Sequence, residues 1–448
     1  MDTRSLTQGN ILKNLILFSL PYLLSCFLQT FYGLADLFIT GRFNGADAIT
    51  AVSVGSQVTH MLTVIIVGLA MGATVSISRA VGEQKQSRVV KIIGNTVLLF
   101  STCALLLTAI LLIGRAGILS LLCVPKAALA ETNGYITICF LGIPFITAYN
   151  VLSSTYRGLG DTKHPMYFVM ISGIINIALD YLFIGSFGMK ASGAALATVI
   201  AQAISVILAL LYMPRTMNIR FTRAAFRIDK AIMRQIMRIG VPISAQDGLI
   251  QISFLIITTI ANRRGVEIAA AVGIVEKIIG FLFLVPSAMS SAVSTICAQN
   301  IGAKAYGRSR KTLFYAMEIS VGFGILFTII CQFCGPQIVQ FFIKDDSMVV
   351  EYGVQYLRIY VFDCIFAGIH FCFSGYFCAA EKPLLSFLHN ILSIALVRIP
   401  VAYLGSTLWP ATMYPMGLAS PLGSLLSAII CVVAYRMLER KFKKRVFG

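Results

Sequence analysis

Acidic side chains inside long apolar stretches are the residues of this sequence that could do chemistry. Asp36 lies in the first apolar stretch, and Asn176 and Asp180 lie in a later one. The spacing of four residues predicts that one helix presents Asn176 and Asp180 on the same face. Thr198, in the segment GAALATVIAQ, adds a hydroxyl group. Because a charged side chain in hydrocarbon is energetically unfavourable, Asp36 and Asp180 must each face a partner or a cavity, which makes them functional candidates.

The residue types indicate which ligand such a site would hold. Carboxylate, amide and hydroxyl oxygens suit a hard cation such as Na⁺, and two carboxylates in a pocket of low dielectric also favour a proton. The sequence therefore predicts a site for Na⁺ or H⁺, and the choice between these two ions stays open. A buried polar cluster that only fixes helix packing is the alternative. No cofactor and no further metal ion are expected, because neither the Cys nor the His residues have the spacing of a ligand set.

Three acids in later apolar stretches could meet a cationic substrate. Glu276 is adjacent to Lys277, so a local charge partner is the alternative interpretation for Glu276. The residues expected to line a substrate cavity are Gln29, Tyr149, Asp247, Glu276 and Asp363.

The composition determines the class of protein to which these candidates belong. Of the 448 residues, 58% are hydrophobic and only 12% are charged, and the mean hydropathy is +0.85. A soluble domain contains about twice that share of charged residues. A disordered chain is excluded as well, because 30 Phe and 17 Tyr leave too little polar sequence. The sequence therefore predicts an integral membrane protein that crosses the bilayer many times.

Twelve stretches are long and apolar enough to span a membrane as helices. They lie near residues 11–40, 50–79, 92–113, 134–156, 165–187, 192–213, 239–260, 267–298, 313–333, 354–379, 385–407 and 417–438. No connection between them is long enough for a soluble domain. We expect an all-α polytopic membrane protein with an N-terminal six-helix lobe (1–213), a basic cytoplasmic linker (214–238) and a C-terminal six-helix lobe (239–448).

The distribution of basic residues predicts the orientation. With the N-terminus inside, 26 of the 36 Lys and Arg residues fall on the inner side. This asymmetry follows the positive-inside rule and places both termini in the cytoplasm, in a plasma or inner membrane. The net charge of +18 is then a topology signal that also favours contact with anionic lipid head groups. Nucleic-acid binding is not expected, because the basic linker has no aromatic array for stacking bases.

The two halves of the sequence resemble each other. SRAVGEQK near residue 78 corresponds to AQNIGAKA near 298, and INIALDYLFIG corresponds to LSIALVRIPVAYLG. Each copy has an even number of spans, so the two copies are parallel and related by a pseudo-two-fold axis along the membrane normal. Transporters built in this way place a central cavity between the halves and rock the halves against each other.

The buried acids are not repeated in the second copy. Asp36 aligns with Ile257 or a close neighbour, and Asp180 aligns with Val397. If these carboxylates only held helices together, the second copy would be expected to keep them. We therefore expect the ion to be bound in the N-terminal half alone.

Several stretches resemble the multidrug and toxic compound extrusion (MATE) family. They are FLQTFYGLADLFITGR, GLAMGATVSISRAVGEQ, STYRGLGDTKHP, NIALDYLFIGSFGMKASGAALATVIAQ and SAVSTICAQNIGAK. The resemblance implies a twelve-helix antiporter that exports cationic or amphipathic compounds in exchange for H⁺ or Na⁺. The residues that match the family's N-terminal ion site are Asp36, Asn150, Asn176, Asp180 and Thr198.

The resemblance does not extend to the second ion site of one family branch. That branch has a Glu in helix seven and an Asp in helix ten. Here the corresponding positions are Ile250 or Gln251 and Ala367. A C-terminal ion site of that kind is therefore not expected.

These observations lead to one functional hypothesis and two rivals. We expect a monomeric antiporter that works by alternating access on small organic substrates. A flippase for lipid-linked sugar precursors is the alternative, but only Lys277, Arg358 and Arg398 are embedded cations that could hold a pyrophosphate. A membrane enzyme is not expected, because no nucleophile and base or metal cluster can be recognised.

Overall fold

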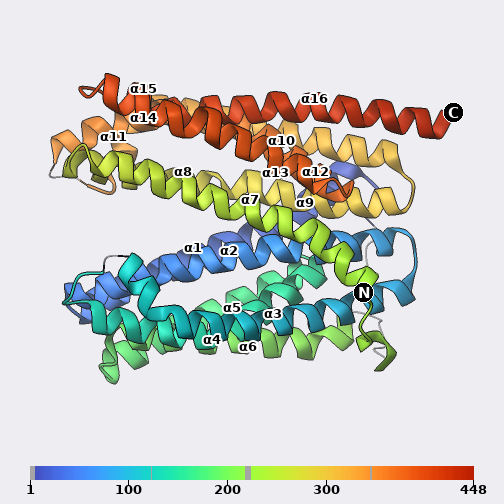
Figure 1. The fold of residues 1–448 in the computed structure, drawn as a ribbon, viewed down its shortest axis with the longest axis horizontal. Coiled ribbons are helices and arrows are strands. Elements are labelled where there is room, and N and C mark those ends of the chain that lie inside the picture. The colour runs from blue at the N-terminus through green and yellow to red at the C-terminus, as the bar shows by residue number, and fades with distance from the viewer. Residues whose placement is uncertain (1–5, 123, 217–222, 344–345, 448) are drawn as a thin grey trace. The chain divides into compact units, whose positions relative to one another are not determined.

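The computed structural model describes residues 6–122, 124–216, 223–343 and 346–447. Within these ranges the regular structure is helical (Figure 1). Eleven helical stretches are long and apolar enough to cross a membrane, and a bent pair of helices makes a twelfth. Helices satisfy every backbone hydrogen bond internally, which lipid requires of a spanning segment. The predicted all-α architecture with twelve spans is confirmed.

The first six spans follow one another through short turns. The short helix η2 (Arg223–Phe226) comes after them. The six spans are α1 (Ile11–Phe43), α2 (Ala46–Gly82), α3 (Gln86–Leu121), α4 (Leu129–Gly158), α5 (Lys163–Asp180) with its π-helical continuation η1 (Tyr181–Ser186), and α6 (Lys190–Thr216).

Four of the last six spans are broken or bent. The pair α11 and α12 bends by 43° within the span expected near 354–379. The six spans are α7 (Lys230–Asn262); α8 (Val266–Leu282) with α9 (Leu284–Gly302); α10 (Tyr306–Gln340); α11 (Ser347–Tyr360) with α12 (Asp363–Ala379); α13 (Pro383–Ser393) with the π-helix η3 (Ile394–Arg398) and α14 (Ile399–Leu408); and α15 (Tyr414–Gly417) with α16 (Ala419–Phe447).

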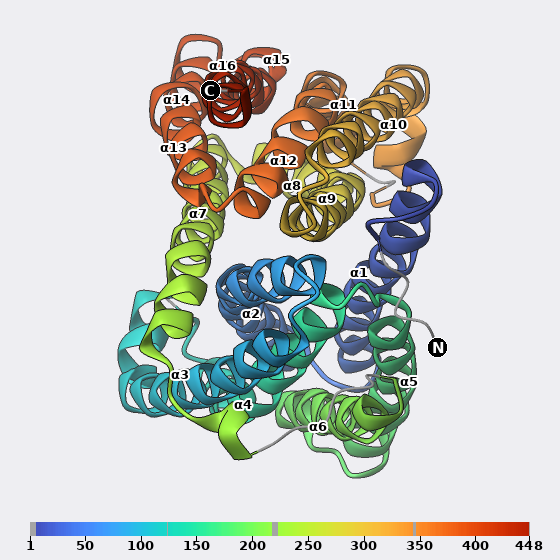
Figure 2. The same cartoon turned by 90° about the vertical axis from the view of Figure 1, so that its right-hand side faces the viewer.

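The internal repeat is visible in the backbone. The turns after α2 and α9 each contain a non-glycine residue with positive φ, Gln84 at 58° and Lys304 at 59°. Both copies also place a π-helix, η1 or η3, in their fifth span. The same spans lie at the centre of each copy: α4 packs against α2, α3 and α6, whereas α12 packs against α9, α10 and α16 (Figure 2).

The helices α1 and α7 each belong to two compact units. Unit 1 contains residues 20–244, and unit 2 contains residues 7–19 and 245–448. The boundary between the two units lies close to Pro21 along α1 and close to Pro242 along α7. Each of these helices therefore begins in one unit and ends in the other.

The first half of α7 packs closely on α2 in unit 1. A Cβ atom on Gly240 would lie 2.3 Å from the carbonyl oxygen of Leu69, and a Cβ atom on Gly72 would lie 2.1 Å from the carbonyl oxygen of Ile236. Only glycine allows the two backbones to approach this closely. The two glycines thus fix the first half of α7 against α2.

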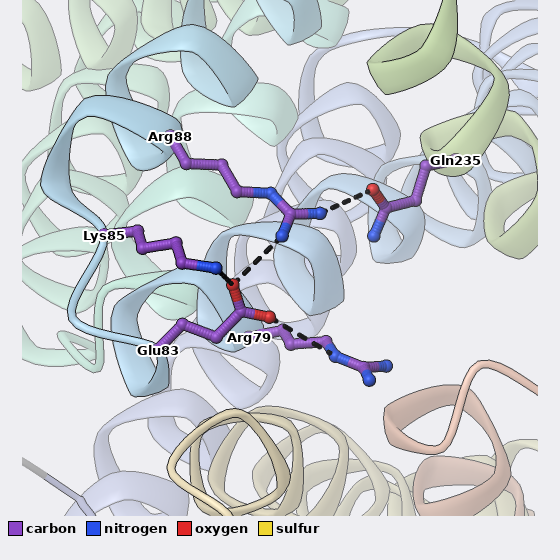
Figure 3. A network of polar contacts seen from close by, with 5 residues as sticks. All are labelled: Arg79, Glu83, Lys85, Arg88 and Gln235. Atoms are coloured by element: carbon purple, nitrogen blue, oxygen red, sulfur yellow. Dashed lines mark hydrogen bonds and ion pairs between the residues drawn. The ribbon is translucent and has the colours of Figure 1, made fainter.

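A polar network holds the turn between α2 and α3 to α7 (Figure 3). Arg88 donates to Glu83 Oε2 at 3.0 Å and to Gln235 Oε1 of α7 at 3.3 Å. Glu83 also pairs with Lys85 at 3.2 Å and with Arg79 at 3.8 Å. Partial burial raises the pKa of Glu83, but the hydrogen bond from Lys85 and the three positive charges outweigh it and lower the pKa below its ordinary value.

Arg308 is the repeat equivalent of Arg88 and has an equivalent role in unit 2. Its Nη1 donates to the carbonyl oxygen of Gly9, just before α1, at 2.9 Å. Its Nε donates to Oδ1 of Asn300 at 3.3 Å. Equivalent arginines therefore hold the starts of α7 and α1, the two helices that end in the opposite unit.

We expect Gly240→Ala to lower the free energy of unfolding by about 1–3 kcal/mol, because the added methyl group would overlap the backbone of α2. Denaturant unfolding in detergent measures this change. Gly280→Ala in α8 is the matched control, since it makes the same change in helix propensity where no atom lies within 4 Å of the new Cβ. Equal losses in the two variants would contradict the packing argument.

We expect the stabilising contribution of Glu83 to depend on pH. Because its pKa is lowered in the folded protein, the contribution is present above the unfolded-state pKa of about 4.3 and is lost as the pH falls through the lower folded-state value. Glu83→Gln should therefore melt at a lower temperature than the parent at pH 7, with a smaller difference at pH 4. A difference that does not change with pH would show that ionisation of Glu83 is not involved.

Candidate ion and substrate sites

Four of the predicted ion-site residues meet in unit 1. Asp36 comes from α1, Asn176 and Asp180 come from α5, and Thr198 comes from α6. Thr198 Oγ1 donates a hydrogen bond to Asp36 Oδ2 at 3.1 Å. The side chains of Asn176 and Asp180 lie beside the same carboxyl group. Asp36, Asn176 and Asp180 are only 6%, 1% and 0% exposed, so the cluster is shielded from the outside.

Most polar atoms of this cluster have no hydrogen-bond partner among the described residues. They are Asp36 Oδ1, both carboxylate oxygens of Asp180, and the oxygen and nitrogen of the Asn176 amide. No described Lys or Arg forms an ion pair with either carboxylate. Buried polar atoms are nearly always bonded to protein, water or an ion, so these atoms are available to a small ligand. Two neighbouring carboxylates specifically favour a proton or a cation, because their negative charges repel each other when both are ionised.

The end of α5 positions two members of the cluster. Asn176 and Asp180 are one helical turn apart and therefore point from the same face. Asp180 is the last residue of α5, and the π-helix η1 begins at Tyr181. Single π-turns inside longer helices occur often at functional sites, because the wider turn changes the direction of neighbouring side chains.

The other expected residues of unit 1 have different surroundings. Asn150 is buried, and its amide nitrogen donates to the carbonyl oxygen of Ile146 on the same helix at 2.8 Å. Tyr149 is buried as well, and its hydroxyl group donates to the carbonyl oxygen of Pro165 at 3.3 Å. Gln29 is half-buried on α1. No described hydrogen bond joins Asn150 to Asp36 or Asp180.

The acids of unit 2 lie near a buried base. Asp363 Oδ2 accepts a hydrogen bond from Arg398 Nη2 at 3.2 Å, and both side chains are buried. The guanidinium group of Arg398 also lies over the ring of Phe254, 5.5 Å from its centroid. Glu276 accepts from Thr258 Oγ1 at 3.3 Å and lies within the field of Arg398. Glu276 forms no ion pair with a described base, and its neighbour Lys277 is exposed.

Asp247 lies apart from this ion pair. It is half-buried on α7 and next to Gln246. The side-chain oxygen of Gln246 accepts a hydrogen bond from Ser386 Oγ at 2.7 Å. The three acids predicted to line a substrate cavity therefore have two different environments within unit 2.

The repeat makes the contrast between the two units clear. Asp180 aligns with Val397, and the next residue in the second copy is the base Arg398. Unit 1 has two buried carboxylates without a basic partner among the described residues, whereas unit 2 has a carboxylate paired with an arginine. Unit 2 therefore contains a buried ion pair, whereas the two carboxylates of unit 1 have no basic partner among the described residues.

Comparisons with known proteins identify the family. The family description MatE matches residues 21–182 and again 242–404, which is one match for each copy of the repeat. The chain belongs to the MatE family. The resemblance noted in the sequence is thereby confirmed, and the protein is an integral membrane protein of a transporter family.

Curated relatives match this MatE protein along nearly its whole length. The probable multidrug resistance protein YpnP of Bacillus subtilis (strain 168) is 28% identical over 97% of each chain. A FAD transporter of Shewanella oneidensis is 26% identical over 98% of this chain and 97% of its own. Among solved structures, an outward-facing multidrug resistance MATE family transporter of the MOP superfamily has a TM-score of 0.92, with 19% identity and 99% coverage of both chains. The fold of this MatE protein is thus the MATE fold.

Two further residues near the carboxylates, Tyr32 and Gln202, were not predicted from the sequence. Tyr32 lies on α1, one turn before Asp36, and is close to both Asp36 and Gln202. Gln202 lies on α6, one turn after Thr198, and its buried side-chain oxygen has no hydrogen-bond partner among the described residues. Spacing of four residues from a predicted site residue is the signal that could have found them.

Two histidines of this MatE protein come together although their sequence spacing gives no sign of it. The rings of His370 and His389 lie 5.6 Å apart. His370 is hydrogen-bonded to Ser424 at 3.3 Å, and His389 to Ser374 at 2.9 Å. Among the described residues, no group of three His, Cys, Asp or Glu side chains could hold a metal ion. The pair therefore belongs to the polar interior of unit 2.

We expect Arg398→Gln to destabilise the protein by about 3–5 kcal/mol, because it leaves the carboxylate of Asp363 buried without its charge partner. The double variant Arg398→Gln with Asp363→Asn should recover part of that loss, since it removes both charges. Denaturant unfolding of the parent, the two single variants and the double variant measures the coupling. Strictly additive losses would contradict the ion pair.

Proposed function

We propose that this protein exports small cationic or amphipathic organic compounds in exchange for H⁺ or Na⁺. The ion is bound by Asp36, Asn176, Asp180 and Thr198 in unit 1. One observation carries the proposal: two buried carboxylates lie together with unbonded polar atoms and without a basic partner among the described residues. Such a site gains a large interaction energy from one positive charge and loses it when that charge leaves.

Relatives support export of organic compounds as the transport function. YpnP of Bacillus subtilis is named a probable multidrug resistance protein, and MepA of Staphylococcus aureus (strain N315), 24% identical, is named a multidrug export protein. The Shewanella relative is named a FAD transporter, so larger anionic cargo also occurs among similar chains. The cationic preference proposed here rests on three acids of unit 2, Asp247, Glu276 and Asp363, of which only Asp363 forms an ion pair with a described base.

Coupling requires that the ion and the substrate favour different conformations. A ligand shifts an equilibrium only by the difference between its affinities for the two states. In this proposal the two units rock against each other, and the ion stabilises one of the two states. The crossing helices α1 and α7 support this view, because each changes unit beside a proline that interrupts its hydrogen bonding.

The flippase hypothesis is less well supported. A pyrophosphate-binding cavity needs several free cations, whereas Arg398 is paired with Asp363. Lys277 is exposed on α8. Arg358 is half-buried on α11 and forms no ion pair with a described residue. One half-buried cation provides less charge than a lipid-linked sugar precursor would require.

We expect Asp36→Asn and Asp180→Asn each to reduce ion-driven export at least tenfold, because each removes a charge that binds the ion. Uptake of a fluorescent organic cation into everted vesicles measures the rate, with matched protein levels. Asp47→Asn is the control, since Asp47 is exposed in the first turn of α2 and makes the same chemical change outside the cluster.

The same assay identifies the coupling ion. Vesicles with only a Na⁺ gradient and vesicles with only a pH gradient should differ in transport, and the difference should vanish in both variants. Normal export and normal ion dependence in Asp36→Asn and in Asp180→Asn would refute the proposal. Loss of export in Asp47→Asn as well would show that the effect is not specific to the cluster.

A further inference from the structure

Unit 2 has a groove that the proposed exchange of ion and substrate does not use. Its cavity, of about 520 Å³, lies between α10, α12 and α16. The helix α12 lies between the other two (Figure 2). The lining residues are Arg310, Phe314, Met317, Glu318, Val321, Ile369, Phe373, Val432, Tyr435, Arg436 and Glu439.

The lining changes from charged to apolar along the groove. Arg310 lies in the second turn of α10, and Val321 follows about 16 Å further along the helix. On α16 the order runs from Glu439 through Tyr435 to Val432. The charged end is the end at which α10 starts, which is cytoplasmic in the predicted topology. Three of the four charged residues, Arg310, Arg436 and Glu439, thus lie toward the predicted cytoplasmic end, whereas Glu318 lies one turn from Val321, beside the apolar lining.

The charges in the groove are balanced. Arg310 and Glu439 pair with each other at 2.7 Å, and the guanidinium group of Arg310 lies over Phe314. Arg436 and Glu318 are exposed and form no ion pair with a described residue. One unpaired cation and one unpaired anion match a zwitterion better than an anion, because an anionic ligand would meet the carboxylate of Glu318.

The surroundings of the groove favour a lipid as the source of that zwitterion. Apolar side chains on both flanking helices are exposed: Ile429, Val433 and Met437 on α16 are more than half exposed, and Tyr315 on α10 is more than a third exposed. In a membrane protein such faces contact acyl chains. A soluble zwitterion would leave the apolar part of the groove unfilled.

The repeat shows how the corresponding surface of unit 1 is covered. Gly94 of α3 is the equivalent of Phe314, and a Cβ atom on it would lie 2.1 Å from the carbonyl oxygen of Ala225 in η2. The next residue, Asn95, donates to the carbonyl oxygen of Arg227 at 3.1 Å and accepts from the backbone nitrogen of Asp229 at 2.8 Å. In unit 1 the chain itself covers this surface, whereas no described residue covers the groove of unit 2.

We propose that the groove between α10, α12 and α16 binds a phospholipid that carries a phosphate and a primary ammonium group, the chemistry of phosphatidylethanolamine. Arg436 binds the phosphate, and Glu318 accepts hydrogen bonds from the ammonium group. One acyl chain lies along Met317, Val321 and Val432. A choline head group has no N–H donor for Glu318, and a glycerol head group has no positive charge, so both bind more weakly.

Native mass spectrometry of the purified, delipidated full chain tests the proposal. Phosphatidylethanolamine, phosphatidylcholine and phosphatidylglycerol with identical acyl chains are added in turn. We expect the ethanolamine lipid to be retained best, and Arg436→Gln to weaken its retention about tenfold, the loss expected for one charge-assisted contact. Arg115→Gln is the matched control, because Arg115 is exposed at the far end of α3.

A second variant separates binding from folding. Glu318→Gln changes an exposed residue and should weaken the preference for ethanolamine over choline, because the amide oxygen accepts a hydrogen bond without the negative charge, while the apolar contacts remain. Glycerophosphoethanolamine, which has the head group without acyl chains, should not compete with the lipid. Equal retention of the three lipids, unchanged preference in Glu318→Gln, or full competition by the soluble head group would overturn the proposal.

Discussion

An ionised side chain inside a bilayer needs an opposite charge or a bound ion, because the hydrocarbon gives it almost no solvation. The two copies of the repeat meet this requirement in different ways. In unit 2, Arg398 supplies a permanent counter-charge to Asp363. In unit 1, Asp36 and Asp180 have no described basic partner, and in the proposed function a bound H⁺ or Na⁺ balances their charge. The two copies of the repeat thus differ in whether their buried carboxylates have a basic partner among the described residues.

Close packing positions the carboxylates of unit 1. A Cβ atom on Gly55 of α2 would lie 2.1 Å from the ring of Tyr135 on α4. Tyr135 is itself close to both Asp36 and Asp180. The small residue on α2 therefore makes room for an aromatic ring near the acidic cluster.

Much of the fold could be predicted from sequence because lipid imposes a simple rule on every span. The lengths of the apolar stretches were enough to predict the twelve spans. The spacing of four residues was enough to predict that Asn176 and Asp180 lie on one helix face. Partners from distant spans were harder to predict. Arg398 pairs with Asp363, and Tyr32 contacts Gln202, only because the helices that carry them are rotated and bent in a particular way. The sequence of one span does not reveal how that span is rotated against its neighbours. The π-helix η1 also changes the direction of the side chains that follow residue 180. A spacing pattern based on a regular α-helix does not predict this change.

The exchange of helix beginnings between the units has a consequence for how such a chain could arise. In a single six-helix copy with this arrangement, the first helical turns would not pack within their own bundle. Two identical copies could satisfy each other by trading these turns, which is the arrangement of a domain-swapped dimer. The present chain has that arrangement in covalent form, with residues 7–19 in the later unit and residues 230–244 in the earlier one. Each unit thus takes the first turns of one helix from the other half of the sequence, and fusion keeps the two copies in one chain.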